Sequence, residues 1–152
     1  MGVKAKVTSE SKVCCDANLL IRSFEPEALE NAKAVALFEK WASELVTIID
    51  PTFFLFEITN AVYRAARDKR SSWDRAETVL AALAAVPIAL VDTLDLLAEI
   101  LEFARLLNGK TSYDAHYLAL AKREDVIFYT ADHRLANASR GRFEFVRDVM
   151  ET

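Results

Sequence analysis

The 152-residue sequence has few of the residues that interrupt regular structure, with only three glycines and three prolines. Together with a hydrophobic fraction of 53%, this scarcity argues against a disordered chain. Cysteine is also scarce, and Cys14 and Cys15 are adjacent. Because neighbouring side chains of a strand point to opposite faces, we do not expect these two thiols to form a disulfide with each other. The sequence therefore predicts a folded protein with two buried thiols, suited to a reducing cytosol.

The chain has no excess of positive charge, since its formal net charge at pH 7 is −4. This argues against a general basic coat for nucleic acid but not against a local basic patch. Long hydrophobic runs are also missing: the longest uncharged apolar stretch, residues 78–91, contains Pro87 and is shorter than the roughly 20 residues that span a bilayer. Residues 1–11 show no signal peptide. We expect one domain over residues 1–152, cytoplasmic and without membrane contact.

Short apolar segments alternate with longer amphipathic ones along the whole chain. This alternation predicts an α/β fold, a three-layer sandwich with a central, mostly parallel five-stranded sheet. The last strand is expected at an edge. The predicted strands cover residues 12–15, 46–49, 88–91, 126–130 and 143–146.

Capping residues mark the predicted helices between these strands. Asp50-Pro51 predicts a helix start, with Asp as N-cap and Pro at the first helical position. Asn108-Gly109 predicts a helix end. The predicted helices are a turn at residues 18–23, then one from Glu25-Pro26-Glu27 to Trp41, one from Asp50 into the basic block 64–70, one from Ser72 to about Ala85, one from Asp92 or Thr93 to Asn108, one over residues 113–123 capped by Thr111 or Ser112, and one over residues 132–138.

Four acids stand at the predicted junctions of these elements. Asp16 and Asp132 follow strands, whereas Glu57 and Asp114 lie in early turns of helices. Each has a structural explanation when taken alone. Asp16 and Asp132 suit helix N-caps, and Asp114 complements a helix dipole. Glu57, a single charge in the nearly apolar run 53–62, suits a solvent-facing edge.

The joint pattern of the four acids favours function. Right-handed crossovers place the ends of parallel strands and the starts of the following helices along one rim of the sheet. Carboxylates gathered there repel one another unless cations neutralise them, and oxygen ligands suit Mg²⁺ or, as the alternative, Mn²⁺. Such ions activate water and stabilise the leaving oxygen in phosphoryl chemistry.

The motifs around these acids resemble those of a PIN domain, and are most similar to the VapC-type toxin ribonucleases of prokaryotic toxin–antitoxin pairs. The resemblance runs from about Lys12 to Val146. It depends on the order and spacing of the motifs together, with the third the most telling. The motifs are VCCDAN at residues 13–18, FEITNA at 56–61, YDAHYLALA at 113–121 and YTADHRL at 129–135.

This resemblance implies a Mg²⁺-dependent endoribonuclease that hydrolyses RNA phosphodiesters. It also implies a homodimer and a cognate antitoxin protein that blocks the site. By position in the motifs, the catalytic and metal-binding acids are Asp16, Glu57, Asp114 and Asp132. Asn18 and Thr130 match supporting polar residues of the family. Ala136 is a departure, because some relatives carry a further acid there, and its absence puts a second metal ion in doubt.

Basic and aromatic side chains offer further candidates for RNA contact. Arg134, Arg140 and Arg142 lie nearest the predicted rim and are favoured for binding RNA. The block Arg64, Arg67, Lys69 and Arg70 is better explained as a solvated helix end. Core packing is favoured for Tyr113 and Tyr117 over stacking on bases, and exposed helical positions are favoured for His116 and His133 over ligation. The apolar segments 53–62 and 79–85 are candidates for the dimer face.

Two rival functions come from other classes. One is a catalytically inactive PIN-like scaffold or binding module that acts through a protein partner, against which the retention of all four acids argues. The other is phosphotransfer with Asp16 as nucleophile. Asn18 stands where a dehalogenase-like pattern needs a second acid, and Arg147 is a poor substitute for the lysine of a receiver-like module, so phosphotransfer ranks last.

Overall fold

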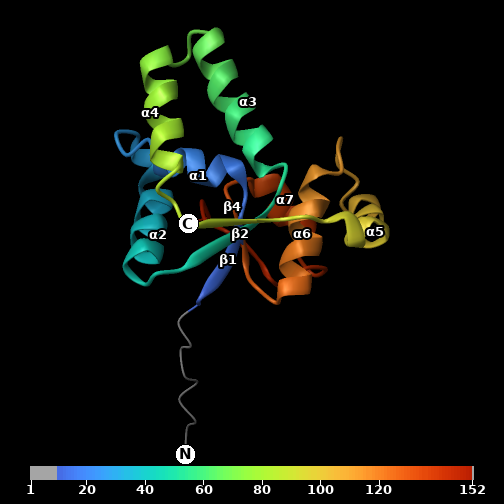
Figure 1. Cartoon of the computed structure of the whole chain (residues 1–152). Helices are drawn as coiled ribbons and strands as arrows, with labels where there is room; N and C mark the ends of the chain where they lie inside the picture. The colour runs from blue at the N-terminus through green and yellow to red at the C-terminus, as the bar shows by residue number, and fades with distance from the viewer. Residues whose placement is uncertain (1–9, 152) are drawn as a thin grey trace, which may run out of the picture.

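The computed structural model describes residues 10–151, and its centre is a five-stranded sheet in the order β3-β2-β1-β4-β5. Every neighbouring pair of strands is parallel (Figure 1). The predicted fold class is therefore confirmed, with β5 at an edge. The strands are β1 Lys12–Cys15, β2 Thr47–Pro51, β3 Ile88–Val91, β4 Phe128–Thr130 and β5 Val146–Asp148.

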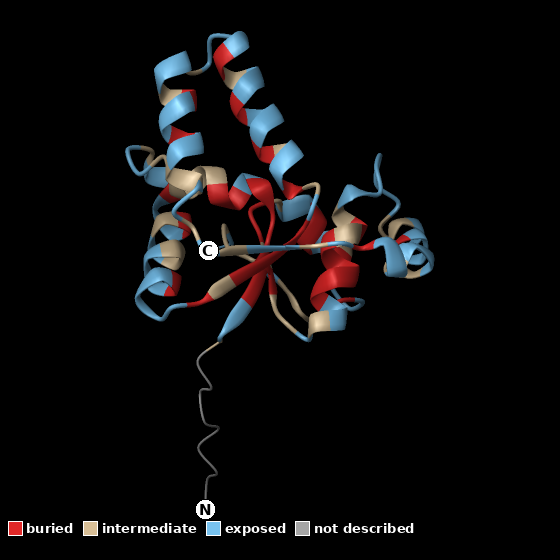
Figure 2. Ribbon diagram, viewed as in Figure 1, coloured by how far each residue is buried: buried red, intermediate tan, exposed pale blue. Residues whose placement is uncertain are grey.

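Helices cover both faces of this sheet, and its central strands are buried (Figure 2). The residues of the central strand β1 alternate between two cores, one on each face. Val13 and Cys15 pack with α2, whereas Cys14 packs with α6. Both thiols are buried and free, as expected. The helices are α1 Ala17–Ser23, α2 Ala32–Ser43, α3 Phe54–Arg67, α4 Trp73–Leu83, α5 Leu97–Leu107, α6 Tyr113–Glu124 and α7 His133–Ser139, with 3₁₀ helices η1 Leu29–Asn31 and η2 Leu94–Leu96.

Helices α3 and α4 form a hairpin that extends away from the sheet (Figure 1). Ile58, Val62 and Ala66 form its buried stripe on α3, and four-residue spacing puts them on one face of that helix. Ser72 is the N-cap of α4, as predicted, and its hydroxyl accepts a hydrogen bond from the backbone N–H of Arg75 at 3.0 Å. The basic block at the end of α3 therefore lies at the hairpin turn.

The predicted helix start at Asp50-Pro51 is wrong, because both residues belong to β2 and α3 begins at Phe54. The side chain of Asp50 is fully buried. Its Oδ1 accepts hydrogen bonds from the backbone N–H of Cys15 and from Sγ of Cys14, each at 3.1 Å. The last paired residues of β1 and β2 are Val13 and Ile48. Beyond them, the carboxyl of Asp50 links the two strands instead of capping a helix.

The helix predicted from residue 25 also begins later, with η1 followed by α2. The reason is the side chain of Asn31, which is 2% exposed. Its Nδ2 donates to the carbonyl of Glu25 at 3.1 Å, and its Oδ1 accepts from Arg22 at 3.0 Å. These bonds hold the preceding residues as a turn.

The last predicted strand is displaced by a few residues. Phe143 is not in a strand: its backbone N–H donates to the carbonyl of Ser139 at 2.8 Å, and its ring packs edge-on against Phe103. Pairing with β4 begins only at Val146. The bounds of β1 and β3 agree with the prediction, whereas β2 extends to Pro51 and β4 begins at Phe128.

None of the helices within residues 10–151 is long and apolar enough to cross a membrane. Residues 1–9 and 152 lie outside the described part of the chain. The expectation about a signal peptide and the outer limits of the predicted domain fall there.

Candidate active site

All four predicted acids line one cavity at the carboxyl edge of the sheet, with a volume of about 390 Å³. Asp16 follows β1, Glu57 lies in the first turn of α3, Asp114 in the first turn of α6, and Asp132 follows β4. Parallel strands and right-handed crossovers bring these positions together. The remaining lining residues are Ala17, Asn18, Ala131, His133 and Arg134.

Asp16 is held from three directions. Its Oδ1 accepts a hydrogen bond from the backbone N–H of Leu19 at 2.8 Å, so it caps α1. Its Oδ2 accepts from the hydroxyl of Thr130 and from the backbone N–H of Ala131, the latter at 3.3 Å. Burial nevertheless raises the pKa of Asp16 to about 6, against the lowering effect of these bonds. The N-cap interpretation is therefore right, and the same carboxyl also lines the acid cavity.

Glu57 receives a hydrogen bond from a residue that the sequence did not mark for this role. The phenol of Tyr117 on α6 donates to Oε1 of Glu57 at 3.1 Å. Burial raises the pKa of Glu57 to about 7, and the charges of Asp114 and Asp16 add to that rise, whereas the bond from Tyr117 opposes it. Packing was expected for Tyr117, and its side chain is indeed buried. The sequence pattern did not predict its contact with Glu57.

Asp114 and Asp132 also line the cavity, and they are close enough for the charge of one to act on the other. Burial, followed by the charge of Asp132, raises the pKa of Asp114, while Arg134 acts in the opposite direction. Asp132 caps α7, since its Oδ1 accepts from the backbone N–H groups of Arg134 at 2.9 Å and Leu135 at 3.2 Å. The hydroxyl oxygen of Thr130 accepts from the N–H of Asp132 at 2.9 Å. Thr130 therefore connects the first and last acids.

The three arginines predicted to contact RNA differ in position. Arg134 lines the acid cavity. Arg140 and Arg142 do not: Arg140 forms an ion pair with Glu151 at 2.6 Å, and Arg142 donates to the carbonyl of Leu106.

The histidines also have other partners. His116 Nδ1 lies 3.0 Å from the hydroxyl of Thr93, and burial lowers the pKa of His116. His133 lines the cavity, but its Nδ1 lies 2.7 Å from Asp148.

The donor set of the cavity suits a hard divalent cation. Four carboxyl groups meet there, and burial, with a smaller contribution from neighbouring acids, raises the pKa of Asp16, Glu57 and Asp114, while Arg134 opposes the rise at Asp114. Within residues 10–151, however, no three His, Cys, Asp or Glu side chains are close enough to ligate one ion together. Mg²⁺ keeps several waters and uses one or two carboxylates directly, so the arrangement fits an ion held partly through water.

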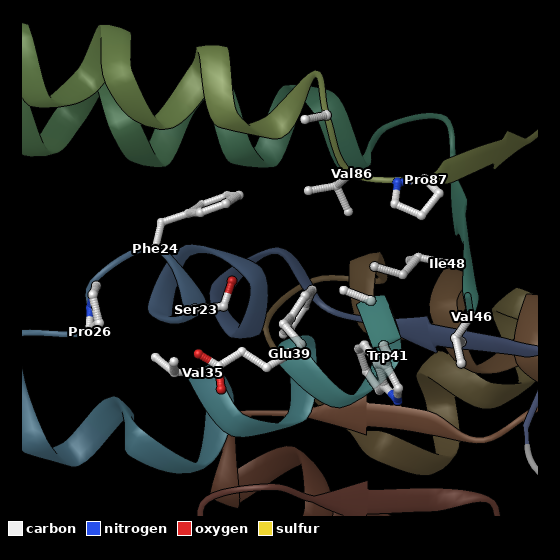
Figure 3. Close-up of a pocket in the computed structure, with 13 residues that line it drawn as sticks. Ser23, Phe24, Pro26, Val35, Glu39, Trp41, Val46, Ile48, Val86 and Pro87 are labelled. Atoms are coloured by element: carbon white, nitrogen blue, oxygen red, sulfur yellow. The ribbon is translucent and has the colours of Figure 1, made fainter. Parts of the chain in front are cut away.

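A second cavity, of about 400 Å³, has the wrong chemistry for such an ion. Figure 3 shows it between the end of α1, α2 and the start of β3, with Phe24, Val35, Trp41 and Val86 among its walls. Glu39 is the one carboxylate that lines it. One carboxylate among apolar walls does not make a metal site or a phosphate site.

Comparison with protein-family models matches residues 13–141 to the PIN domain. The chain belongs to the PIN domain family. The chain is similar to the crystal structure of PAE2754 from Pyrobaculum aerophilum, with a TM-score of 0.63 and 24% identity over 91% of this chain and 92% of that one. That identity supports a shared fold only. A search of curated proteins found no match. PIN domains form a nuclease superfamily and typically use divalent metal ions.

This PIN domain has no further acid one turn after Asp132, because Ala136 stands there and is 6% exposed. A carboxylate is instead found deeper, at Asp50, which does not line the acid cavity. Burial raises the pKa of Asp50 well above its ordinary value, and the charge of Asp16 adds to this. Sequence reasoning missed Asp50 because Asp-Pro is also a common helix start.

Proposed function

We propose that this PIN domain is a divalent-metal-dependent endoribonuclease and the toxin component of a type II toxin–antitoxin pair. The observation that supports it best is the gathering of Asp16, Glu57, Asp114 and Asp132, which span most of the chain, around one cavity. Such a cluster disfavours its own ionisation unless a cation is present. A protein that binds no cation there has little physical reason to place four carboxyl groups around one cavity.

The proposed roles follow from the contacts of each acid. Asp16, Glu57, Asp114 and Asp132 bind Mg²⁺ or Mn²⁺, directly or through water. When bound, such an ion polarises the phosphate and lowers the pKa of a water molecule. Thr130 and the N–H of Ala131 hold Asp16, and Tyr117 holds Glu57. Arg134 supplies the positive charge that attracts a phosphate to the mouth of an otherwise acidic cavity.

The partners in this proposal are an RNA substrate, a second copy of the chain and a cognate antitoxin that blocks the acid cavity. A dimer needs an exposed apolar surface, and the start of α3 provides one, with Phe56 74% exposed and Leu55 41% exposed. On α5, Leu97 and Leu101 are exposed as well. Phe56→Asp is expected to convert a dimer to a monomer in analytical ultracentrifugation.

The direct test is cleavage of single-stranded RNA by the purified protein with Mg²⁺, with EDTA and with the variant Asp16→Asn. We expect cleavage with Mg²⁺ only, and a loss of at least about 100-fold in the variant. Asp74→Asn is the matched control, because Asp74 is exposed on α4 and outside the acid cavity, and it should cleave like the wild type.

Two results would contradict the proposal. Equal cleavage under all three conditions would show that the acid cavity is not the nuclease site. Absence of cleavage together with the absence of a saturable Mn²⁺ site would instead support the inactive scaffold.

A further inference from the structure

A third cavity, of about 440 Å³, lies beside the acid cavity, and the two share Asp114, Asp132 and Arg134. Its other walls are the last residue of α5, Leu107, the α5–α6 connection at residues 108–111, and two residues of α7, Leu135 and Ala138. Its volume falls within the roughly 300–1,000 Å³ typical of ligand-binding cavities. A ligand bound there lies next to two of the four acids.

The walls of this cavity divide by chemistry. Lys110 and Arg134 are basic, whereas Leu107, Leu135 and Ala138 are apolar. Within residues 10–151, the side chains of Lys110 and Arg134 form no ion pair. Two cations that form no ion pair there, beside an apolar surface, match one nucleotide, whose phosphate needs positive charge and whose base needs an apolar contact.

The loop that presents Lys110 is held in place. Asn108 takes a left-handed conformation, with φ of 50°, and its N–H donates to the carbonyl of Ala104 at 2.9 Å, which ends α5. Arg142 donates to the carbonyl of Leu106 and so ties the same helix end to the segment that follows α7. The two walls of the cavity are therefore connected, which gives Arg142 a positioning role instead of direct contact with RNA.

We propose that this cavity binds the nucleotide next to the scissile phosphate of single-stranded RNA. Lys110 contacts a backbone phosphate, and the base packs against Leu107 and Ala138. Only an unpaired base can enter such a cavity, so the geometry favours single-stranded over double-stranded RNA. The inference rests on the proposed function and adds the element that selects the substrate.

The test measures RNA binding separately from cleavage. Fluorescence anisotropy gives the Kd of a labelled hexaribonucleotide, with Ca²⁺ in place of Mg²⁺, over a range of salt concentrations. Lys110→Ala should weaken binding about fivefold and reduce the slope of log K against log salt by about 0.7, the value for one phosphate contact on a single strand. Ala138→Phe, which fills the apolar side, should weaken binding about tenfold and leave that slope unchanged.

The control is Lys12→Ala, which removes the same charge at the opposite end of β1 from Asp16 and should bind RNA like the wild type. The subsite is refuted if Lys110→Ala and Ala138→Phe bind like the wild type, if Lys12→Ala weakens binding equally, or if the wild type does not bind the oligonucleotide. Lys110 is exposed, so Lys110→Ala should fold and still tests RNA binding if Ala138→Phe does not fold. Expected binding effects without any cleavage in Mg²⁺ would reject the nuclease and leave this cavity as a binding site for single-stranded RNA, with no scissile phosphate beside it.

Discussion

The phenol of Tyr117 donates a hydrogen bond to Glu57 Oε1 across 60 residues of sequence, at 3.1 Å. The ring of Tyr117 is 1% exposed and fixed between Phe53, edge-on at 5.3 Å, and Phe128, stacked at 5.5 Å. A carboxylate on α3 is thus oriented by a core residue of α6. Packing of the sheet therefore controls the geometry of the acid cavity.

Tyr117→Phe should reduce RNA cleavage near neutral pH more than at higher pH. The phenol lowers the pKa of Glu57 from what burial alone would give, so its loss raises that pKa above about 7 and leaves less carboxylate to bind metal. Stability should fall by about 1 kcal/mol for the lost hydrogen bond. A pH–rate profile with urea unfolding measures both effects. Tyr113→Phe, at an exposed position, is the control, and an unshifted profile in Tyr117→Phe would contradict the assigned role.

Affinity for Mn²⁺ should increase as the pH rises through the interval from about 6 to about 7. In this interval Asp16, with a pKa of about 6, and Glu57, with a pKa of about 7, lose their protons in the metal-free protein. Each proton must leave before the carboxylate can ligate, so binding also releases protons. Isothermal titration calorimetry in buffers of different ionisation enthalpy measures how many protons are released when Mn²⁺ binds. An affinity that does not change with pH would exclude both acids as ligands.

Without metal, the folded state should lose stability as the pH rises from about 4 to about 8. The folded pKa values of Asp16 and Glu57 lie above the ordinary values of 3.8 and 4.5, so the native state binds more protons there. Asp16→Asn removes one of these ionisations, so its free energy of unfolding relative to wild type should improve by roughly 2–3 kcal/mol over that range. Chemical denaturation in EDTA measures this difference in the free energy of unfolding. A difference that does not change with pH would contradict a buried Asp16 with a raised pKa.

Substitutions at Asp50 should affect stability through the strand connection. Asp50→Ala leaves the N–H of Cys15 without its partner, at a cost of about 1–3 kcal/mol. Asp50→Asn keeps an acceptor and cannot ionise. Because burial raises the pKa of Asp50, the Asn variant should gain stability relative to wild type as the pH rises above about 4. Denaturation curves of both variants at several pH values provide the test, and equal stability of Ala and Asn variants would contradict the assigned hydrogen bond.

The sequence by itself determined the features that depend on a few neighbouring residues. The buried run of β1, the N-caps at Ser72 and Asp132, and the helix end at Asn108 follow from local periodicity and capping, whose interactions span about four residues. The parallel order of the elements then made it predictable that four separate acids would meet at one edge. No further information was needed for that convergence, because crossover handedness is general.

Only the tertiary structure decided the contacts between distant segments. The local sequence Asp50-Pro51 predicts a helix start, yet Asp50 accepts hydrogen bonds from Cys14 and Cys15, which are 36 and 35 residues away. The phenol of Tyr117 reaches Glu57, and Arg142 faces a helix end instead of the acid cavity, for the same kind of reason. Each of these depends on which side chains packing brings within about 3 Å, and no local pattern encodes that distance.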